Sequence, residues 1–350
     1  MSAKSNDADS EEEPGEPRHP RATAELFGHA AAEAAFLTAY RSGRVPHAFL
    51  ITGPKGIGKA TFAYRIARFV LAHPDPIVAA VQKAKSLAVD ANDPVARRIA
   101  AQGQGDLLIL ERTPNEKGVL RQQIAVDDVR RTVSFFGSTA GEGGWRIAIV
   151  DAVDELNRSS ANALLKVLEE PPQRALLLLV SHAAGRVPAT LRSRCRIVTL
   201  RPLAQPDVAA ALAAATGLSA SDPRVLAAAE AAEGSVGRAL ALLDEDALAL
   251  RQQALDLLDG LPALNANGMH ALGDALAGTD PQPLASFIDT VNAWLSSRLD
   301  REHGEIGRLA RLAEVWERVN QAARDAAEYN LERKPLVFNV FGLLAEAMRR

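Results

Sequence analysis

One segment of the chain has residue types and spacing that suit phosphate chemistry. Residues 53–61 read Gly-Pro-Lys-Gly-Ile-Gly-Lys-Ala-Thr. Glycines let successive backbone N–H groups wrap phosphate oxygens, and a lysine reaches the β- and γ-phosphates. The hydroxyl expected on Mg²⁺ is replaced by Ala60, and Thr61, about 100° further around a helix, cannot simply substitute for it. The segment predicts a phosphate-binding loop with a damaged metal contact; its candidate residues are Gly53, Gly56, Gly58, Lys59 and Thr61.

A second candidate is an acid at the end of an apolar run. Residues 146–151 read Arg-Ile-Ala-Ile-Val-Asp, which is typical of a strand whose last carboxylate, Asp151, holds the Mg²⁺ of a bound nucleotide. In hydrolysing proteins with this pattern a glutamate follows and polarises the attacking water, but here the position is Ala152. Asp154 and Glu155 are interpreted as a solvated helix start. Together, Ala60 and Ala152 favour a degenerate nucleotide site over an active one.

A third candidate is the arginine-rich segment 191–196, Leu-Arg-Ser-Arg-Cys-Arg. An arginine on the rim of a loop can reach a phosphate bound to another subunit, and such a finger is worth roughly 10³–10⁵ in rate. An arginine-rich loop on its own is usually a solvated surface. The two preceding motifs favour the finger, with Arg194 as its candidate, while Cys195 is expected to be a buried or rim thiol that is not a nucleophile.

Five short apolar runs are expected to position these segments. Most lack in/out alternation, which suits strands covered on both faces of a parallel sheet. Helical stretches such as 61–72 and 158–170 separate them, and this alternation predicts an α/β domain. The expected strands are 47–52, 106–110, 146–151, 175–181 and 196–200.

After residue 202 the strand signals stop and helical patterns continue to the end. We expect an α/β domain over 21–202, a small helical domain over 203–262 and a helical C-terminal domain over 263–350, although the last two could be one body. In the last of these, two apolar helix faces are predicted. Residues 1–20 are acidic and proline-rich, and are expected to form a disordered tail. The two faces comprise Leu284, Phe287, Ile288, Val291 and Leu295, and Leu312, Val315 and Val319.

Composition narrows the function classes. No apolar run approaches the roughly 20 residues that cross a bilayer, and the N-terminus lacks the apolar stretch of a signal peptide. A single cysteine rules out an intramolecular disulfide framework and a zinc site built on several thiolates. The net charge of −3 gives no global nucleic-acid signature, so DNA contact would need a local patch or a partner. A cytoplasmic protein without membrane contact is the default expectation.

Several motifs together resemble one family. Ser193-Arg194-Cys195 resembles the SRC motif of clamp-loader AAA+ subunits. Residues 162–172, Asn-Ala-Leu-Leu-Lys-Val-Leu-Glu-Glu-Pro-Pro, are similar to a signature that the family carries between its acidic strand and SRC, and 27–29 and 330–335 are similar as well. The resemblance covers about residues 24–350. It implies an AAA+ P-loop domain, a helical lid domain and an all-α collar domain in a subunit of the DNA polymerase III clamp loader.

Departures from the family pattern narrow the role that the resemblance implies. The motor subunits gamma and tau carry an intact Gly-Lys-Thr/Ser, an acidic pair and a four-cysteine zinc module, all of which this chain lacks. The delta subunit usually lacks the SRC motif. These departures fit neither a motor subunit nor delta. The resemblance implies that the chain joins three motor subunits and delta in a pentamer, in which Arg194 acts on ATP of the adjacent motor subunit. Sensor positions would fall near Ser181 or His182 and near Arg238, with Gly237 where motor subunits place the arginine.

In this interpretation the chain has no catalysis of its own, although it would belong to a DNA polymerase holoenzyme that loads the sliding clamp on primer–template DNA. It requires no cofactor and no zinc, and whether Lys59 still holds ATP or ADP stays open. One alternative is a clamp-loader subunit that hydrolyses ATP despite Ala60 and Ala152. Another, a P-loop kinase or other small-molecule enzyme, leaves the SRC motif and the collar signature without a reason.

Overall fold

The structure is a computed structural model that describes residues 19–113, 121, 123–137, 144–278, 280–301 and 306–349. Its contacts group the chain into an α/β unit, Met1–Gly237, and a helical unit, Arg238–Arg350. The domain boundaries expected at residues 202 and 262 remain a prediction. The tail expected over residues 1–20 lies almost wholly outside the described residues.

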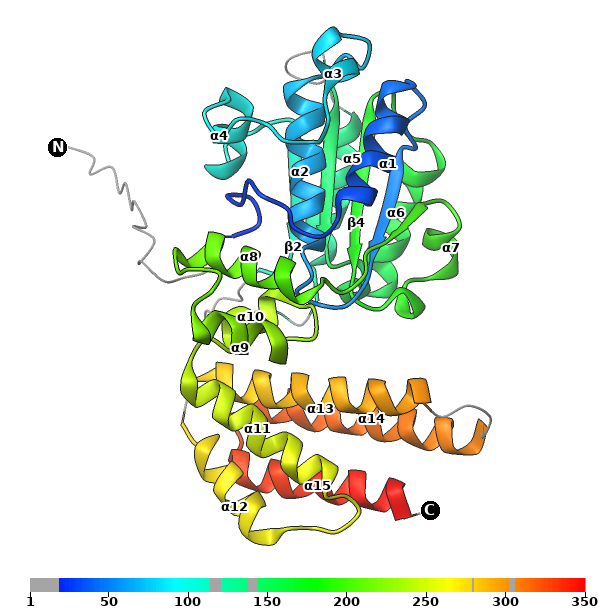
Figure 1. The fold of residues 1–350 in the computed structure, drawn as a ribbon. Helices are drawn as coiled ribbons and strands as arrows, with labels where there is room; N and C mark the ends of the chain where they lie inside the picture. Colours follow the sequence, from blue (N-terminus) through cyan, green and yellow to red (C-terminus); the bar gives the residue numbers. More distant parts are fainter. Residues whose placement is uncertain are drawn as a thin grey trace, which may run out of the picture. The chain divides into compact units, whose positions relative to one another are not determined.

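The α/β unit is built on a five-stranded sheet in the order β2–β3–β4–β1–β5, and every neighbouring pair is parallel (Figure 1). All five strands predicted from the sequence are present, each within one residue of the expected ends. Strands β1 and β4 are buried along their whole length, which explains why they show no alternation of polar and apolar residues. The strands are β1 (Ala48–Thr52), β2 (Leu107–Glu111), β3 (Arg146–Asp151), β4 (Ala175–Ser181) and β5 (Arg196–Thr199).

Helices cover both faces of this sheet because successive strand residues point to opposite sides. Leu50, Val150 and Leu177 lie in a core with α5 and α6, whereas Phe49 packs toward α1, where its ring centroid is 5.3 Å from that of Phe36. The predicted helices 61–72 and 158–170 are present as α2 and α6. The helices of the unit are α1 (Ala30–Arg41), α2 (Lys59–Ala72), α3 (Ala79–Lys83), α4 (Pro94–Ala100), α5 (Val126–Gly137), α6 (Arg158–Glu169), α7 (Ala189–Arg192), α8 (Gln205–Thr216) and α9 (Pro223–Ala231), and α10 (Val236–Ala241) crosses into the helical unit.

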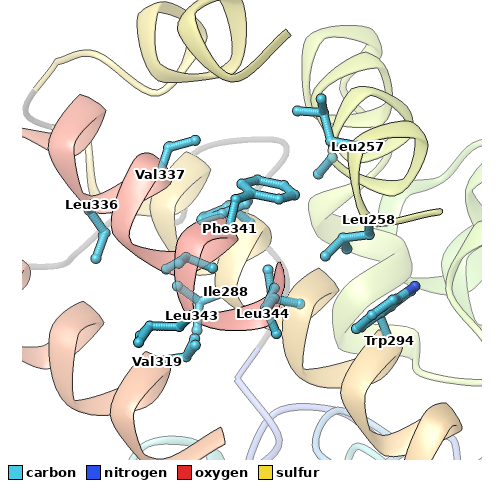
Figure 2. Packing of buried hydrophobic residues seen from close by; sticks show 14 of the residues in the cluster. Leu257, Leu258, Ile288, Trp294, Val319, Leu336, Val337, Phe341, Leu343 and Leu344 are labelled. Carbon is cyan, nitrogen blue, oxygen red and sulfur yellow. The ribbon is translucent and has the colours of Figure 1, made fainter. Parts of the chain in front are cut away.

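The described part of the helical unit consists of helices around one apolar core (Figure 2). Both apolar faces predicted from the sequence, 284–295 and 312–319, contribute to that core. Phe341 is 1% exposed and lies 6.2 Å, between ring centroids, from the fully buried Phe287. None of the helices that the structure describes is both long and apolar enough to span a bilayer. After α10 the helices are α11 (Glu245–Asp259), α12 (Ala266–Ala275), α13 (Pro281–Arg301), α14 (Ile306–Glu328) and α15 (Arg333–Arg349).

We predict that Phe341→Ala destabilises the helical unit by about 3–5 kcal/mol, because it leaves a cavity among side chains that cannot fully collapse. Tyr329→Ala is the control: Tyr329 is 66% exposed, and its loss should change the free energy of unfolding by less than about 0.5 kcal/mol. The measurement is urea unfolding followed by the fluorescence of Trp294 and Trp316, which lie in this unit. Equal effects of the two substitutions would contradict the packing described.

Candidate functional site

The glycine-rich segment forms a loop between β1 and α2, the context that a phosphate-binding loop requires. Gly53, Gly56 and Gly58 have φ values of 141°, 77° and 93°, a region that side chains rarely adopt. A Cβ on Gly53 would lie 2.4 Å from the carbonyl oxygen of Leu200. Gly58 is the N-cap of α2, whose first three residues are Lys59, Ala60 and the half-buried Thr61. The glycines are therefore required by the local backbone as well as by any phosphate.

Lys59 is the charged centre of this loop and is only 3% exposed. Its Nζ donates a hydrogen bond to the carbonyl oxygen of Pro54 in the same loop. Burial lowers the pKa of Lys59 to about 8, although the nearby carboxylates of Asp151 and Asp154 favour its charged form. Burial also raises the pKa of Asp151, and the charge of Lys59 opposes that rise. The loop thus holds a buried cation that is only partly compensated, the condition in which an anion would bind favourably.

Other segments of the α/β unit hold the loop from outside. Ser235 Oγ donates to the carbonyl oxygen of Lys55 at 3.0 Å, and the Gly237 N–H donates to the carbonyl oxygen of Gly56 at 3.0 Å. The buried His29 is hydrogen bonded through Nε2 to the carbonyl oxygen of Ile57 at 2.7 Å, so Nε2 carries the proton. Sequence reasoning missed the roles of Ser235 and His29. The Gly-Ser-Val-Gly run at 234–237 is the only local signal, and it does not say which loop it contacts.

The acidic strand end lies beside this loop. Asp151 is the last residue of β3, and Ala152, which follows it, is 1% exposed and brings no group that could polarise water. The interpretation of Asp154 and Glu155 as a solvated helix start is wrong. Both are half-buried in the 3₁₀ turn Val153–Glu155, where Asp154 Oδ1 accepts from the His182 N–H at 3.0 Å and Glu155 pairs with Arg112 at 2.8 Å. They are held in place by the adjacent strand end and loop.

The three sensor candidates lie in different environments. Ser181 is fully buried at the end of β4, and its Oγ accepts from the Ala183 N–H at 3.2 Å. His182 follows it, and its buried Nδ1 has no hydrogen-bond partner among the described residues. Burial lowers the pKa of His182 to about 4, and the nearby charge of Lys59 acts in the same direction, so the ring is neutral at pH 7. Arg238 lies on α10 and is the first residue of the helical unit.

The candidate finger lies at the opposite edge of the sheet from the loop. Because β1 and β5 run parallel, the loop follows the carboxyl end of β1 while Arg194 precedes the amino end of β5. The four residues of β5 separate the two by roughly 13 Å. Arg194 Nη2 pairs with Glu169 Oε1 at 2.8 Å, and Nη1 donates to the carbonyl oxygen of Thr190 at 3.0 Å. The structure therefore brings Lys59, Asp151 and His182 together and leaves Arg194 apart from them.

The two other SRC residues support this segment. Ser193 is exposed, and its Oγ donates to the carbonyl oxygen of Thr190 at 3.2 Å. Cys195 is half-buried and packs against the core under α6, and burial raises the pKa of its thiol to about 11. A thiol that stays protonated at neutral pH suits packing better than nucleophilic attack. Among the residues that the structure describes, no group of three or more His, Cys, Asp or Glu side chains could hold a metal ion.

A parallel sheet with a glycine-rich loop between its first strand and the following helix defines the class of P-loop proteins. Comparison with known proteins then gives the family. The family model described as "DNA polymerase III, delta subunit" matches residues 28–204, just over half of the chain. The chain belongs to this family, and within it resembles the subunits named delta′. The family resemblance expected from the SRC motif and the 162–172 signature is confirmed.

Individual relatives agree with this assignment. The chain is 36% identical over 149 residues to the delta′ subunit of DNA polymerase III from Pseudomonas aeruginosa, which covers 43% of this chain and 41% of that protein. It is 30% identical over 217 residues to the delta′ subunit from Escherichia coli, and this match covers 60% of this chain and 58% of that protein. It is 29% identical over 229 residues to the tau subunit from Escherichia coli, covering 65% and 33%. The match spans less than two thirds of the length of each relative.

Solved structures give more distant likenesses. A gamma-subunit-related protein of DNA polymerase III from Thermotoga maritima has a TM-score of 0.41 and 15% identity, covering 89% of this chain and 99% of that one. A RuvB variant from the same organism has a TM-score of 0.42 and 17% identity, covering 93% and 92%. Neither the fold nor the function of this chain rests on them.

We predict that Gly56→Ala lowers the free energy of unfolding by about 1–3 kcal/mol. The alanine would have to keep the left-handed φ of Gly56, and its Cβ would lie 2.4 Å from Ser235 Oγ. Gly105→Ala is the matched control, since a Cβ there meets nothing within 4 Å and its φ is not left-handed. Urea unfolding followed by the fluorescence of Trp145, in the same unit, measures both. Equal effects would mean that residues 235–237 move away from the loop without cost.

The half-buried His182 should make the free energy of unfolding depend on pH. Its pKa is about 4 in the folded chain and about 6.5 in an unfolded one, so the unfolded chain binds the proton first as the pH falls through this window. Stability contributed by the neutral ring is present above about pH 6.5 and is lost toward pH 4. We predict that His182→Gln reduces the loss of unfolding free energy between pH 7 and about pH 4.5 by about 1–2 kcal/mol. The same substitution at the exposed His270 should leave the loss unchanged.

Proposed function

We propose that the chain is the non-hydrolysing delta-prime subunit of the DNA polymerase III clamp loader, and that it supplies Arg194 as an arginine finger to ATP on a neighbouring motor subunit. The observation that carries this proposal is the position of Arg194 at the edge of the sheet opposite the chain's own loop. A guanidinium there is too far from that loop to act in cis. It is 38% exposed, so a phosphate of another subunit can approach it.

The chain's own loop supports the first half of the proposal. Its backbone and Lys59 fit a phosphate group, but Ala60 offers Mg²⁺ no oxygen and Ala152 offers water no base. Lys59 donates to the carbonyl oxygen of Pro54, and the Gly56 carbonyl oxygen accepts from the Gly237 N–H. An ATP bound here would lack two groups that hydrolysis needs, so the proposed role uses no hydrolysis by this chain.

The family supports the second half. Its members are subunits of DNA polymerase III, and relatives named gamma, tau and delta′ match this chain. We infer that gamma or tau and the delta subunit are its partners, and that the sliding clamp and primer–template DNA are reached through the assembled complex. In that complex the Arg194 guanidinium would stabilise the negative charge that develops on the transferred phosphoryl group. Loading of the clamp in the cytoplasm during replication is the resulting role.

The alternative, an ATP-hydrolysing clamp-loader subunit, keeps some support. Lys59 and Asp151 lie together, and Thr61 is only one residue from the vacant hydroxyl position. The two proposals differ in a measurable way, because only the alternative expects turnover by the isolated chain.

We predict that the isolated chain does not hydrolyse ATP, and that Arg194→Ala lowers turnover at the ATP site of the adjacent motor subunit by about 10³-fold or more, as expected for loss of a finger. Because Arg194 faces one of three motor sites in the proposed complex, the turnover of the whole clamp loader should fall by about a third when the sites act independently, and by more when they are coupled. Arg97→Ala is the control, because Arg97 is an exposed arginine on α4 of the same unit. Turnover is measured by phosphate release, and assembly of each complex is checked by size-exclusion chromatography.

Two results would contradict the proposal. Turnover by the isolated chain that disappears with Lys59→Ala would make the chain a motor subunit. Unchanged turnover in an assembled Arg194→Ala complex would show that Arg194 is not an arginine finger.

A further inference from the structure

One ion pair of the α/β unit, between Glu169 and Arg194, joins the candidate finger to the 162–172 signature. Glu169 is the last residue of α6 and lies in the Leu-Glu-Glu-Pro-Pro end of the 162–172 signature. Its Oε1 lies 2.8 Å from Arg194 Nη2. Nothing in the proposed function so far uses this part of the signature.

The local sequence places a carboxylate here against the preference of the helix. Pro171 and Pro172 cannot continue a helix, so α6 ends at Glu169. A helix carries partial negative charge at its carboxyl end, where Glu169 and the exposed Glu170 add two further negative charges. A nearby cation relieves this repulsion, and Arg194 supplies one.

Arg194 is held at more than one point. The carbonyl oxygen of Thr190 accepts from Nη1 at 3.0 Å, and the Arg194 N–H donates to the carbonyl oxygen of Leu191, a fully buried residue, at 3.1 Å. A guanidinium has five N–H donors, and its contacts with Thr190 and Glu169 leave others for phosphate oxygens. The backbone is therefore fixed on the core, and the side chain is oriented while its head stays 38% exposed.

We propose that Glu169 is a positioning residue for the Arg194 finger. An unpaired arginine on a surface samples many rotamers, and a phosphate that meets it must order the whole side chain. The Glu169 carboxylate restricts that freedom before the neighbouring subunit arrives. This inference rests on the proposed function, because it assigns Glu169 a role only through the finger.

An opposite role is physically conceivable and is tested by the same variants. The negative charge of Glu169 could compete with phosphate for the guanidinium, in which case its removal would raise turnover. Positioning predicts a loss, since removal returns rotamer freedom to Arg194.

The test is a double-mutant cycle in the reconstituted clamp loader. At the motor site that Arg194 faces, Glu169→Ala should lower kcat by about 2- to 5-fold, the range that a partly exposed ion pair supports, with little change in KM for ATP. Glu169→Gln should fall between wild type and Glu169→Ala, because an amide oxygen still accepts from the guanidinium. In an Arg194→Ala background, Glu169→Ala should have no further effect. Glu170→Ala removes the same charge one residue away and should leave kcat unchanged.

Each outcome decides something different. An unchanged or raised kcat for Glu169→Ala overturns the positioning role, and so does an equal loss in the Arg194→Ala background. If Arg194→Ala itself leaves turnover unchanged, the proposed function fails and this inference fails with it. A second readout on the isolated full chain is the guanidinium NMR signal that disappears in Arg194→Ala. Glu169→Ala, and not Glu170→Ala, should speed its hydrogen exchange, and equal rates would also overturn the inference.

Discussion

The parallel pairing of β1 with β4 on one side and β5 on the other is the constraint on which both sites depend. Parallel strands present all their carboxyl ends at one edge of a sheet and all their amino ends at the other. The loop after β1, Asp151 at the end of β3 and His182 after β4 therefore meet, whereas Arg194, before β5, cannot join them. An antiparallel pairing of β5 with β1 would instead put Arg194 beside the chain's own glycine-rich loop. The topology thus separates the glycine-rich loop from Arg194, which is what the proposed action of Arg194 on another subunit requires.

Burial of Lys59 determines the charge balance at the edge of the sheet where the strands have their carboxyl ends. Lys59 lies away from water among Asp151, Asp154 and a neutral His182, and its burial works against its own charge. A phosphate would compensate such a cation strongly in a site of low dielectric. Without one, the Pro54 carbonyl and the nearby carboxylates compensate it in part. The loop keeps the charge of a nucleotide site while lacking the oxygen and the base that hydrolysis needs.

Much of this could be predicted from the sequence because the signals are local. The strands are short apolar runs between glycine- and proline-rich turns. The loop is recognisable by its glycines, whose φ values other residues rarely adopt. The contacts that join distant segments could not be predicted. Ser235 reaches Lys55 across 180 positions, and Glu169 meets Arg194 because α6 ends beside α7. Asp154 and Glu155 were misinterpreted for the same reason, since their partners His182 and Arg112 lie elsewhere in the chain.

The glycines of the loop are required by the backbone whether or not a phosphate binds there. Gly53 and Gly56 adopt backbone conformations that carry the chain past Leu200 and Ser235 with no space for a side chain. Replacing either would strain the turn from β1 into α2, whether or not a phosphate ever binds. Ala60 and Ala152, by contrast, occupy positions where a lost oxygen or carboxylate leaves no gap in the backbone. The backbone therefore constrains the glycines of the loop and, through the parallel pairing of β1 and β5, the position of Arg194, whereas residues 60 and 152 carry no comparable constraint.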